Sequence, residues 1–253
     1  MKKNFIILWI ASFVIVFLAV YVSNVLDKEY PITSTIGIES KKVSYRFEKI
    51  SYGKENYKFI IRTDVDDLSG KLFWKSKSDT MWQSEVLQKS DLVLTAEIPA
   101  LKPDNSILYF VELYHKNQKF VIPDNQKVSL TFFGKIPVTV SILEFLLLYL
   151  GLVLAVRTGL EYFNNGKDSK KFGMFTVLFF LTLIALVNPL YLTYKYGFIN
   201  SSIPPIDRLF LWADVIIFVI WIITLVAIFR SNKLNFLTLV SAVASLIIFV
   251  LFR

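Results

Sequence analysis

The stretch PVTVSILEFLLLYLGLVLAVRTGLE, residues 137–161, decides the fold of this chain. It contains about 20 apolar residues interrupted by one carboxylate, Glu144, and this length suffices to cross a hydrocarbon core of ~30 Å. A polar segment of about 100 residues precedes it, and almost everything that follows is apolar. The stretch therefore predicts a multi-pass helical membrane protein in which one polar module lies before a block of membrane helices.

Composition supports this class and excludes several others. Of the 253 residues, 55% are hydrophobic, which is too many for an ordinary soluble domain. The chain has no cysteine, which excludes disulfides, thiolate metal sites and cysteine nucleophiles. The net charge of +8 is spread along the chain, without the clustered basic face that nucleic-acid binding requires. We therefore expect a lipid bilayer as the surroundings, no nucleic-acid partner and no cofactor.

Apolar runs predict five membrane spans, at residues 5–22, 138–156, 172–193, 209–229 and 234–252. The first run follows Lys2 and Lys3 and is longer than the apolar core of a usual signal peptide. We favour a retained anchor over residues 1–27, and a cleaved signal peptide remains the alternative. The last two spans are joined by four residues and must form an antiparallel hairpin.

Basic residues predict the orientation of these spans. They occur before the first span, between the second and third, and between the fourth and fifth, at Lys2, Lys3, Arg157, Lys167, Lys170, Lys171, Arg230 and Lys233. Short loops rich in Lys and Arg remain in the cytoplasm. We therefore expect a plasma-membrane protein whose polar module lies outside the cytoplasm.

The polar segment, residues 28–136, has the pattern of an all-β domain. After a linker at 28–41, short runs alternate between apolar and polar residues, as at 43–47, and turn residues such as Gly53 and Pro103 separate them. We expect strands at 43–47, 57–63, 71–74, 82–86, 92–98, 107–113, 119–122 and 128–133. Seven or eight antiparallel strands are typical of an immunoglobulin-like or fibronectin type III-like sandwich, with Trp74 as a candidate core residue.

Several short motifs resemble those of a group of bacterial multi-pass envelope proteins. They are the strand end 131–137, the helix end 157–161, and the pairs Asn188-Pro189, Tyr196-Gly197 and Ile203-Pro204. The resemblance covers residues 90–253, and it implies an N-terminal anchor, a fibronectin-like outer domain and a membrane block of four helices over 137–253. It implies no activity, because none is assigned to that group.

This chain departs from the group in two places. Residues 208–214 read RLFLWAD, where the group has a loop rich in Asp, Thr, Asn and Lys. Glu144 stands where the group tends to have a histidine. Any role that depends on that polar loop is therefore not implied for this chain.

Four polar side chains are predicted to lie at one depth in the outer half of the bundle. Glu144 and Asp214 each follow the outer start of a helix by about two turns, and Asn188 and Ser245 precede an outer end by a similar length. Because ionisable groups are costly in hydrocarbon, such residues face a bundle interior and find partners there. We expect Glu144 and Asp214 to face each other, either as a pocket for a cation, a proton or a polar headgroup, or as a structural cluster that fixes helix register.

Other polar residues have plainer interpretations. Arg157 and Glu161 are four residues apart and share a helix face at the cytoplasmic boundary, as an ion pair that anchors the helix end or as a partner site. Asn188-Pro189 predicts a kink in the third span. His115, the only histidine, is expected on the surface in a hairpin turn and not in a metal site.

Three function classes follow from these observations. The first, which we favour, is a non-enzymatic membrane protein whose outer β-sandwich binds or positions an envelope partner. The second is ion- or proton-coupled transport, or small-ligand binding, at the polar cluster. The third, an enzyme acting on lipid, lacks a recognisable nucleophile. The sequence is also compatible with an oligomer.

Overall fold

The computed structural model describes residues 2–27, 29–77, 79–124, 126–198 and 204–253, and Ile203 of the motif quoted above lies outside them. The chain divides into two compact units. A helical unit comprises Met1–Asp27, Ile136–Tyr194 and Phe198–Arg253, and a β unit comprises Lys28–Lys135 together with Lys195–Gly197. Each unit is described below by itself.

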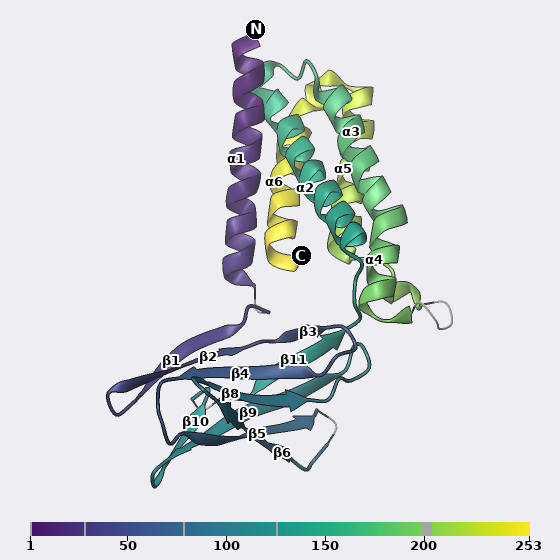
Figure 1. Ribbon diagram of the computed structural model, residues 1–253. Coiled ribbons are helices and arrows are strands. Elements are labelled where there is room, and N and C mark those ends of the chain that lie inside the picture. The colour runs from purple at the N-terminus through teal and green to yellow at the C-terminus, as the bar shows by residue number, and fades with distance from the viewer. Residues whose placement is uncertain (1, 28, 78, 125, 199–203) are drawn as a thin grey trace. The chain divides into compact units, whose positions relative to one another are not determined.

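The helical unit contains five segments that are long and apolar enough to cross a membrane, at Phe5–Leu26, Val138–Asn164, Ser169–Lys195, Trp212–Arg230 and Lys233–Phe252. This confirms the five predicted apolar spans. The helices are α1 (Lys2–Leu26), α2 (Val138–Leu160), α3 (Ser169–Thr182), α4 (Asn188–Lys195), α5 (Trp212–Arg230) and α6 (Phe236–Phe252). In Figure 1 the start of α1 lies at the same end of this unit as the α2–α3 and α5–α6 connections.

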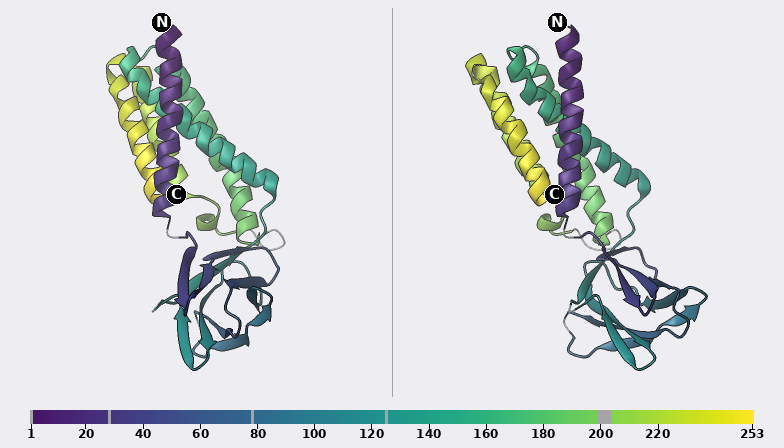
Figure 2. Two further views of the ribbon diagram at one scale, coloured as in Figure 1. Left: turned by 60° about the vertical axis from the view of Figure 1, so that its left-hand side comes forward. Right: turned by 90° about the vertical axis from the view of Figure 1, so that its left-hand side faces the viewer.

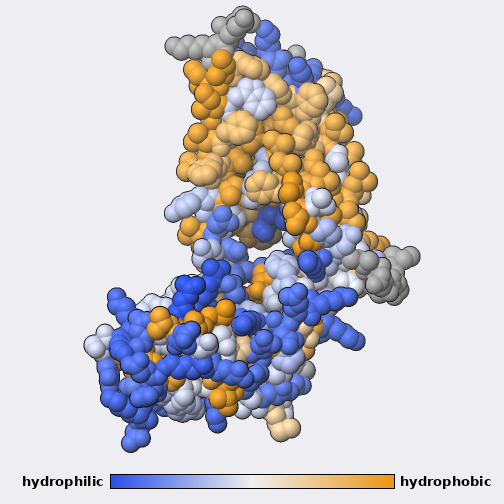
Figure 3. All heavy atoms as spheres, in the orientation of Figure 1, coloured by the Kyte–Doolittle hydropathy of each residue, from blue (hydrophilic) through white to orange (hydrophobic). Residues whose placement is uncertain are grey.

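Side chains from all long helices build one core in this unit. Val16 of α1, Leu152 of α2, Phe180 of α3, Trp221 of α5 and Phe249 of α6 are all buried in it. Outward-facing residues are large and apolar along every span, and Figure 3 shows a hydrophobic surface over the visible face of the helices. An apolar exterior around a packed interior is what a bilayer favours.

Small residues let α2 approach its neighbours closely. A Cβ at Gly159 would lie 2.5 Å from the Cβ of Ala242 on α6, and one at Gly151 would lie 3.3 Å from the Phe180 ring on α3. Close approach at glycine and alanine is the usual way in which membrane helices pack, because lipid offers no hydrophobic driving force between them.

The third span is irregular before its proline. The helix α3 passes into a π-helical turn, Leu183–Val187, and then into α4, which begins with Asn188 and Pro189. Proline lacks the N–H that would bond one turn back, so the ladder must change there. The predicted kink therefore takes the form of a π-helical turn, a feature found often at functional sites.

The β unit consists of two sheets, as predicted (Figures 1 and 2). One has the strand order β1-β2-β4-β8-β7 and the other β3-β11-β9-β5-β6, with β10 pairing with β9. The strands are β1 (Ile32–Ile38), β2 (Lys41–Phe47), β3 (Ile50–Tyr52), β4 (Tyr57–Thr63), β5 (Ser69–Ser76), β6 (Gln83–Val86), β7 (Gln88–Ser90), β8 (Val93–Ile98), β9 (Ser106–His115), β10 (Gln118–Ile122) and β11 (Val128–Phe133).

Three sequence expectations for this unit are wrong. The segment taken as a linker contains β1, which pairs with β2 along its whole length. The sheets are not purely antiparallel, because β11 pairs with β3 in parallel, from Thr131 opposite Ile50 to Phe133 opposite Tyr52. His115 is buried at 7% exposure, since it is the last residue of β9 and alternates inward.

Aromatic side chains supply much of the core between the sheets. Phe47, Phe59 and Tyr109 are fully buried and contact one another edge-on or tilted, with ring centroids 5.1 to 6.2 Å apart. Tyr109 also donates a 2.7 Å hydrogen bond to the carbonyl of Glu48, so its hydroxyl is satisfied. Trp74, the predicted core residue, is only partly buried and packs against this core from its margin.

Candidate functional site

Three of the four residues predicted to share one depth form a connected group, in which an arginine that the sequence analysis did not include joins the two carboxylates. Arg253, directly after α6, donates its Nε to Asp214 Oδ1 at 3.0 Å and its Nη2 to Glu144 Oε1. Asn188 donates its amide to the second oxygen of Asp214 at 2.8 Å. The carboxylates of Glu144 and Asp214 thus bind the same guanidinium.

The four side chains Glu144, Asn188, Asp214 and Arg253 are all removed from solvent to a large extent. Asp214 and Asn188 are fully buried, and the Glu144 and Arg253 side chains are each 14% exposed. Four elements converge, since the residues come from α2, α4, α5 and the end of α6. Two carboxylates and one guanidinium leave one negative charge in excess, and Asn188 Oδ1 has no hydrogen-bond partner among the described residues.

Ser245, the fourth residue, belongs to a different set of contacts. Its hydroxyl accepts a 3.0 Å bond from Trp221 Nε1 and donates a 2.7 Å bond to the Ser241 carbonyl. One turn further along, the hydroxyls of Thr224 and Ser241 lie 2.5 Å apart. These contacts join α5 to α6, and among the described residues no hydrogen bond joins Ser245 to Glu144, Asn188 or Asp214.

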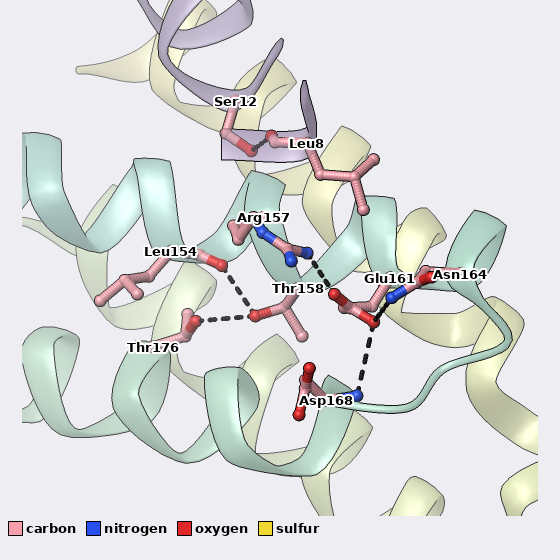
Figure 4. Close-up of polar contacts among 9 residues, drawn as sticks. All are labelled: Leu8, Ser12, Leu154, Arg157, Thr158, Glu161, Asn164, Asp168 and Thr176. Carbon is pink, nitrogen blue, oxygen red and sulfur yellow. Dashed lines mark hydrogen bonds and ion pairs between the residues drawn. The ribbon is translucent and has the colours of Figure 1, made fainter. Parts of the chain in front are cut away.

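Arg157, near the end of α2, and Glu161, directly after that helix, form a fully buried ion pair at the opposite end of α2 from Glu144. Arg157 Nη1 lies 2.5 Å from Glu161 Oε1, and both side chains have no exposed surface. The two atoms are in ionic contact without hydrogen-bonding alignment. Figure 4 shows the guanidinium pointing toward Glu161, whose other oxygen accepts from Asn164 Nδ2 at 3.1 Å and from the backbone of Asp168 at 3.4 Å.

Aromatic rings complete the surroundings of Arg157. Its guanidinium carbon lies 4.7 Å from the centroid of Phe172, 5.3 Å from that of Phe5 and 5.7 Å from that of Trp9. A cation close to ring faces is stabilised by their quadrupoles, and more so when it is removed from water. The pair therefore links α2 to α1 and α3, in addition to anchoring the end of α2 as the spacing suggested.

The β unit carries a groove of about 450 Å³ on the outer face of β1, β2 and β4. Thr33 and Ser44 supply hydroxyls, and Arg46, Lys58 and Arg62 supply three cations. Arg46 is paired with Glu48 at 2.6 Å. The charged side chains point outward because strands alternate, with Phe47, Phe59 and Ile61 facing the core between them.

Several ionisable groups elsewhere in the β unit have local partners. Hydrogen bonding and the charge of Lys116 hold the pKa of Glu39 below its usual value, and His115 adds to this effect. Burial raises the pKa of Tyr109 and of Tyr57. Among the described residues, no group of three or more His, Asp or Glu side chains is arranged to hold a metal ion.

Comparison with known proteins adds no identity to this geometry, since neither the protein-family models nor the curated proteins contain a match to this chain.

Proposed function

We propose that this chain is a non-enzymatic, multi-pass protein of the bacterial plasma membrane whose β unit lies outside the cytoplasm and binds an envelope partner. The observation that supports the proposal is the groove on β1, β2 and β4, because it is open and more of its charged side chains are cations than anions. Three cations and one carboxylate line it, so its net charge is +2. We infer that the partner presents anionic groups there.

The distribution of basic residues supports the orientation. The start of α1 and the α2–α3 and α5–α6 connections lie at one end of the helical unit and carry most of its Lys and Arg residues (Figure 1). Such an end remains in the cytoplasm. The connections to the β unit leave from the other ends of α1 and α2, which supports an outside location for that unit.

The proposal is tested by reversing charge in the groove of the full-length protein. Lys58→Glu with Arg62→Glu changes two exposed side chains and leaves the inward-facing residues of β4 intact. Since like charges placed together across an interface cost several kcal/mol, we expect partner recovery from solubilised membranes to fall by about tenfold or more.

A matched control is Lys71→Glu with Lys77→Glu. Lys71 lies on β5 of the other sheet, Lys77 follows that strand directly, and both are exposed. This control should recover the same co-purifying proteins as the wild type. Equal recovery by the groove variant, or an equal loss in the control, would contradict the proposal.

The second candidate is binding of a proton or cation at Glu144, Asp214 and Asn188. Two observations favour it, the excess negative charge and the unpartnered Asn188 Oδ1, and the π-helical turn before Asn188 adds to them. Against it, the guanidinium of Arg253 already occupies both carboxylates. Cation-dependent flux in proteoliposomes that disappears in Asp214→Asn would place this candidate first.

A further inference from the structure

The helical unit has an apolar groove of about 450 Å³ where α1, α2 and α3 meet. Trp9 and Phe13 of α1 form one wall and Phe175 and Phe179 of α3 form the other, while leucine and valine side chains of α2 form the remainder. Among the residues that the structure describes, Lys171 is the only ionisable side chain that lines the groove. The groove is thus apolar along its length with one cation.

The cation lies at one end of the groove. The helix α3 begins at Ser169, so Lys171 is in its first turn, whereas Phe179 is eight residues further and ~12 Å deeper at 1.5 Å per residue. Lys171 is exposed, and none of the ion pairs described for this chain includes it. A molecule that fits this arrangement has an apolar chain and an anionic head.

Packed aromatic rings and a buried cation hold the side chains at the end of the groove near Lys171. The Trp9 and Phe172 rings, both lining residues, meet edge to face at 5.6 Å. Behind them lies the Arg157 guanidinium, 4.7 Å from the Phe172 centroid and 5.7 Å from that of Trp9. Because Arg157 is held by Glu161, the buried ion pair fixes the wall beside which Lys171 stands.

The groove has its cation at the basic end of the helical unit. The α2–α3 and α5–α6 connections lie at one end of this unit (Figure 1), and the residues in or beside them include Lys167, Lys170, Lys171, Arg230 and Lys233. Of these, Lys170 is directed over the Phe229 ring at 5.5 Å. Basic pockets between membrane helices on the cytoplasmic side attract anionic lipid head groups.

We propose that this groove binds one anionic phospholipid, with an acyl chain between α1 and α3 and its phosphate on the Lys171 ammonium. This lipid site is independent of the groove on β1, β2 and β4 that is proposed to bind the envelope partner. It requires a glycerophospholipid with net negative charge, such as phosphatidylglycerol, and not merely any chain of the bilayer.

Native mass spectrometry of the full-length protein in mild detergent tests the proposal. The probes are phosphatidylglycerol and phosphatidylcholine with identical acyl chains. We expect the first phosphatidylglycerol to bind about fivefold more tightly, as one lysine near an anionic head group provides. Lys171→Gln should abolish this preference, whereas Lys233→Gln, an exposed lysine outside the groove, should preserve it.

A second measurement locates the chain. Phosphatidylglycerol brominated on its acyl chain should quench tryptophan fluorescence, and Trp9→Phe should remove the most readily saturated part of that quenching. Equal binding of the two lipids by the wild type would overturn the proposal. So would equal losses in Lys171→Gln and Lys233→Gln, which would indicate a diffuse basic surface, or quenching that is unchanged in Trp9→Phe.

Discussion

Replacing Glu161 by leucine should destabilise the helical unit severely, because it leaves a fully buried cation without its counter-charge. Arg157 and Glu161 have no exposed surface, and the substitution also removes the acceptor of Asn164 Nδ2 and of the Asp168 amide. Removing one partner of a buried pair costs about 3–5 kcal/mol. Cation–π attraction to three rings offsets a fraction of this, so we expect a loss of ~3 kcal/mol.

The matched variants separate the charge from the packing. Arg157→Met with Glu161→Leu removes both charges and keeps an apolar chain among the rings, so its stability should lie within ~1 kcal/mol of the wild type. Phe163→Leu, at an exposed neighbour, should change stability by no more than ~0.5 kcal/mol.

The assay is reversible unfolding of the full-length protein in mixed micelles, followed by helical circular dichroism at increasing denaturing detergent. The reasoning would be refuted if Glu161→Leu lost no more stability than Phe163→Leu. It would also be refuted if the double variant lost as much stability as Arg157→Met and Glu161→Leu lose in sum when made singly, because the two charges would then be uncoupled.

Three further predictions concern other contacts. Gly159→Leu should prevent α2 from approaching α6 and destabilise the helical unit by at least ~1–3 kcal/mol in the same assay, because even a Cβ there would lie 2.5 Å from the Ala242 Cβ. Arg253→Gln should lower the free energy of unfolding of the helical unit by ~3 kcal/mol or more, since the Asp214 and Glu144 carboxylates lose their shared cation. Arg253→Lys should lower it by less. Because burial raises the pKa of Tyr109, the folded state favours the neutral form of this side chain. The contribution of Tyr109 to the stability of the β unit should therefore be constant below the ordinary pKa of 10.0 and fall above it by up to ~1.4 kcal/mol per pH unit. Alkaline unfolding should show a shallower fall in Tyr109→Phe.

Apolar length and strand alternation predicted the elements of this fold well. Strands β4 and β11 coincide with the predicted runs, since Tyr57–Thr63 and Val128–Phe133 alternate cleanly between turn residues. Strand β1 was missed because Ile32–Ile38 is mostly Thr, Ser and Gly at the sheet edge, with only its last residue buried. The parallel pairing of β11 with β3 depends on tertiary contacts that no local pattern encodes.

Helical depth predicted part of the polar cluster. Glu144, Asn188 and Asp214 do belong to one connected group, as expected. The count from the helix start was wrong for Asp214, because α5 begins at Trp212 and Asp214 therefore lies in its first turn, not two turns in. It could not assign Ser245, since the direction of a side chain around the helix decides its partner, and Ser245 points to Trp221. Arg253 was not considered as a partner, although a basic residue one position after an apolar span was a usable signal.

Topology is tested most directly by labelling single cysteines in this cysteine-free chain. Lys54→Cys lies in an exposed turn between β3 and β4, and Lys167→Cys is exposed between α2 and α3. On intact cells, a membrane-impermeant maleimide should label the cysteine at 54 and should reach the one at 167 only after permeabilisation. Labelling of the cysteine at 167 but not of the one at 54 on intact cells would contradict a β unit outside the membrane with the α2–α3 connection in the cytoplasm.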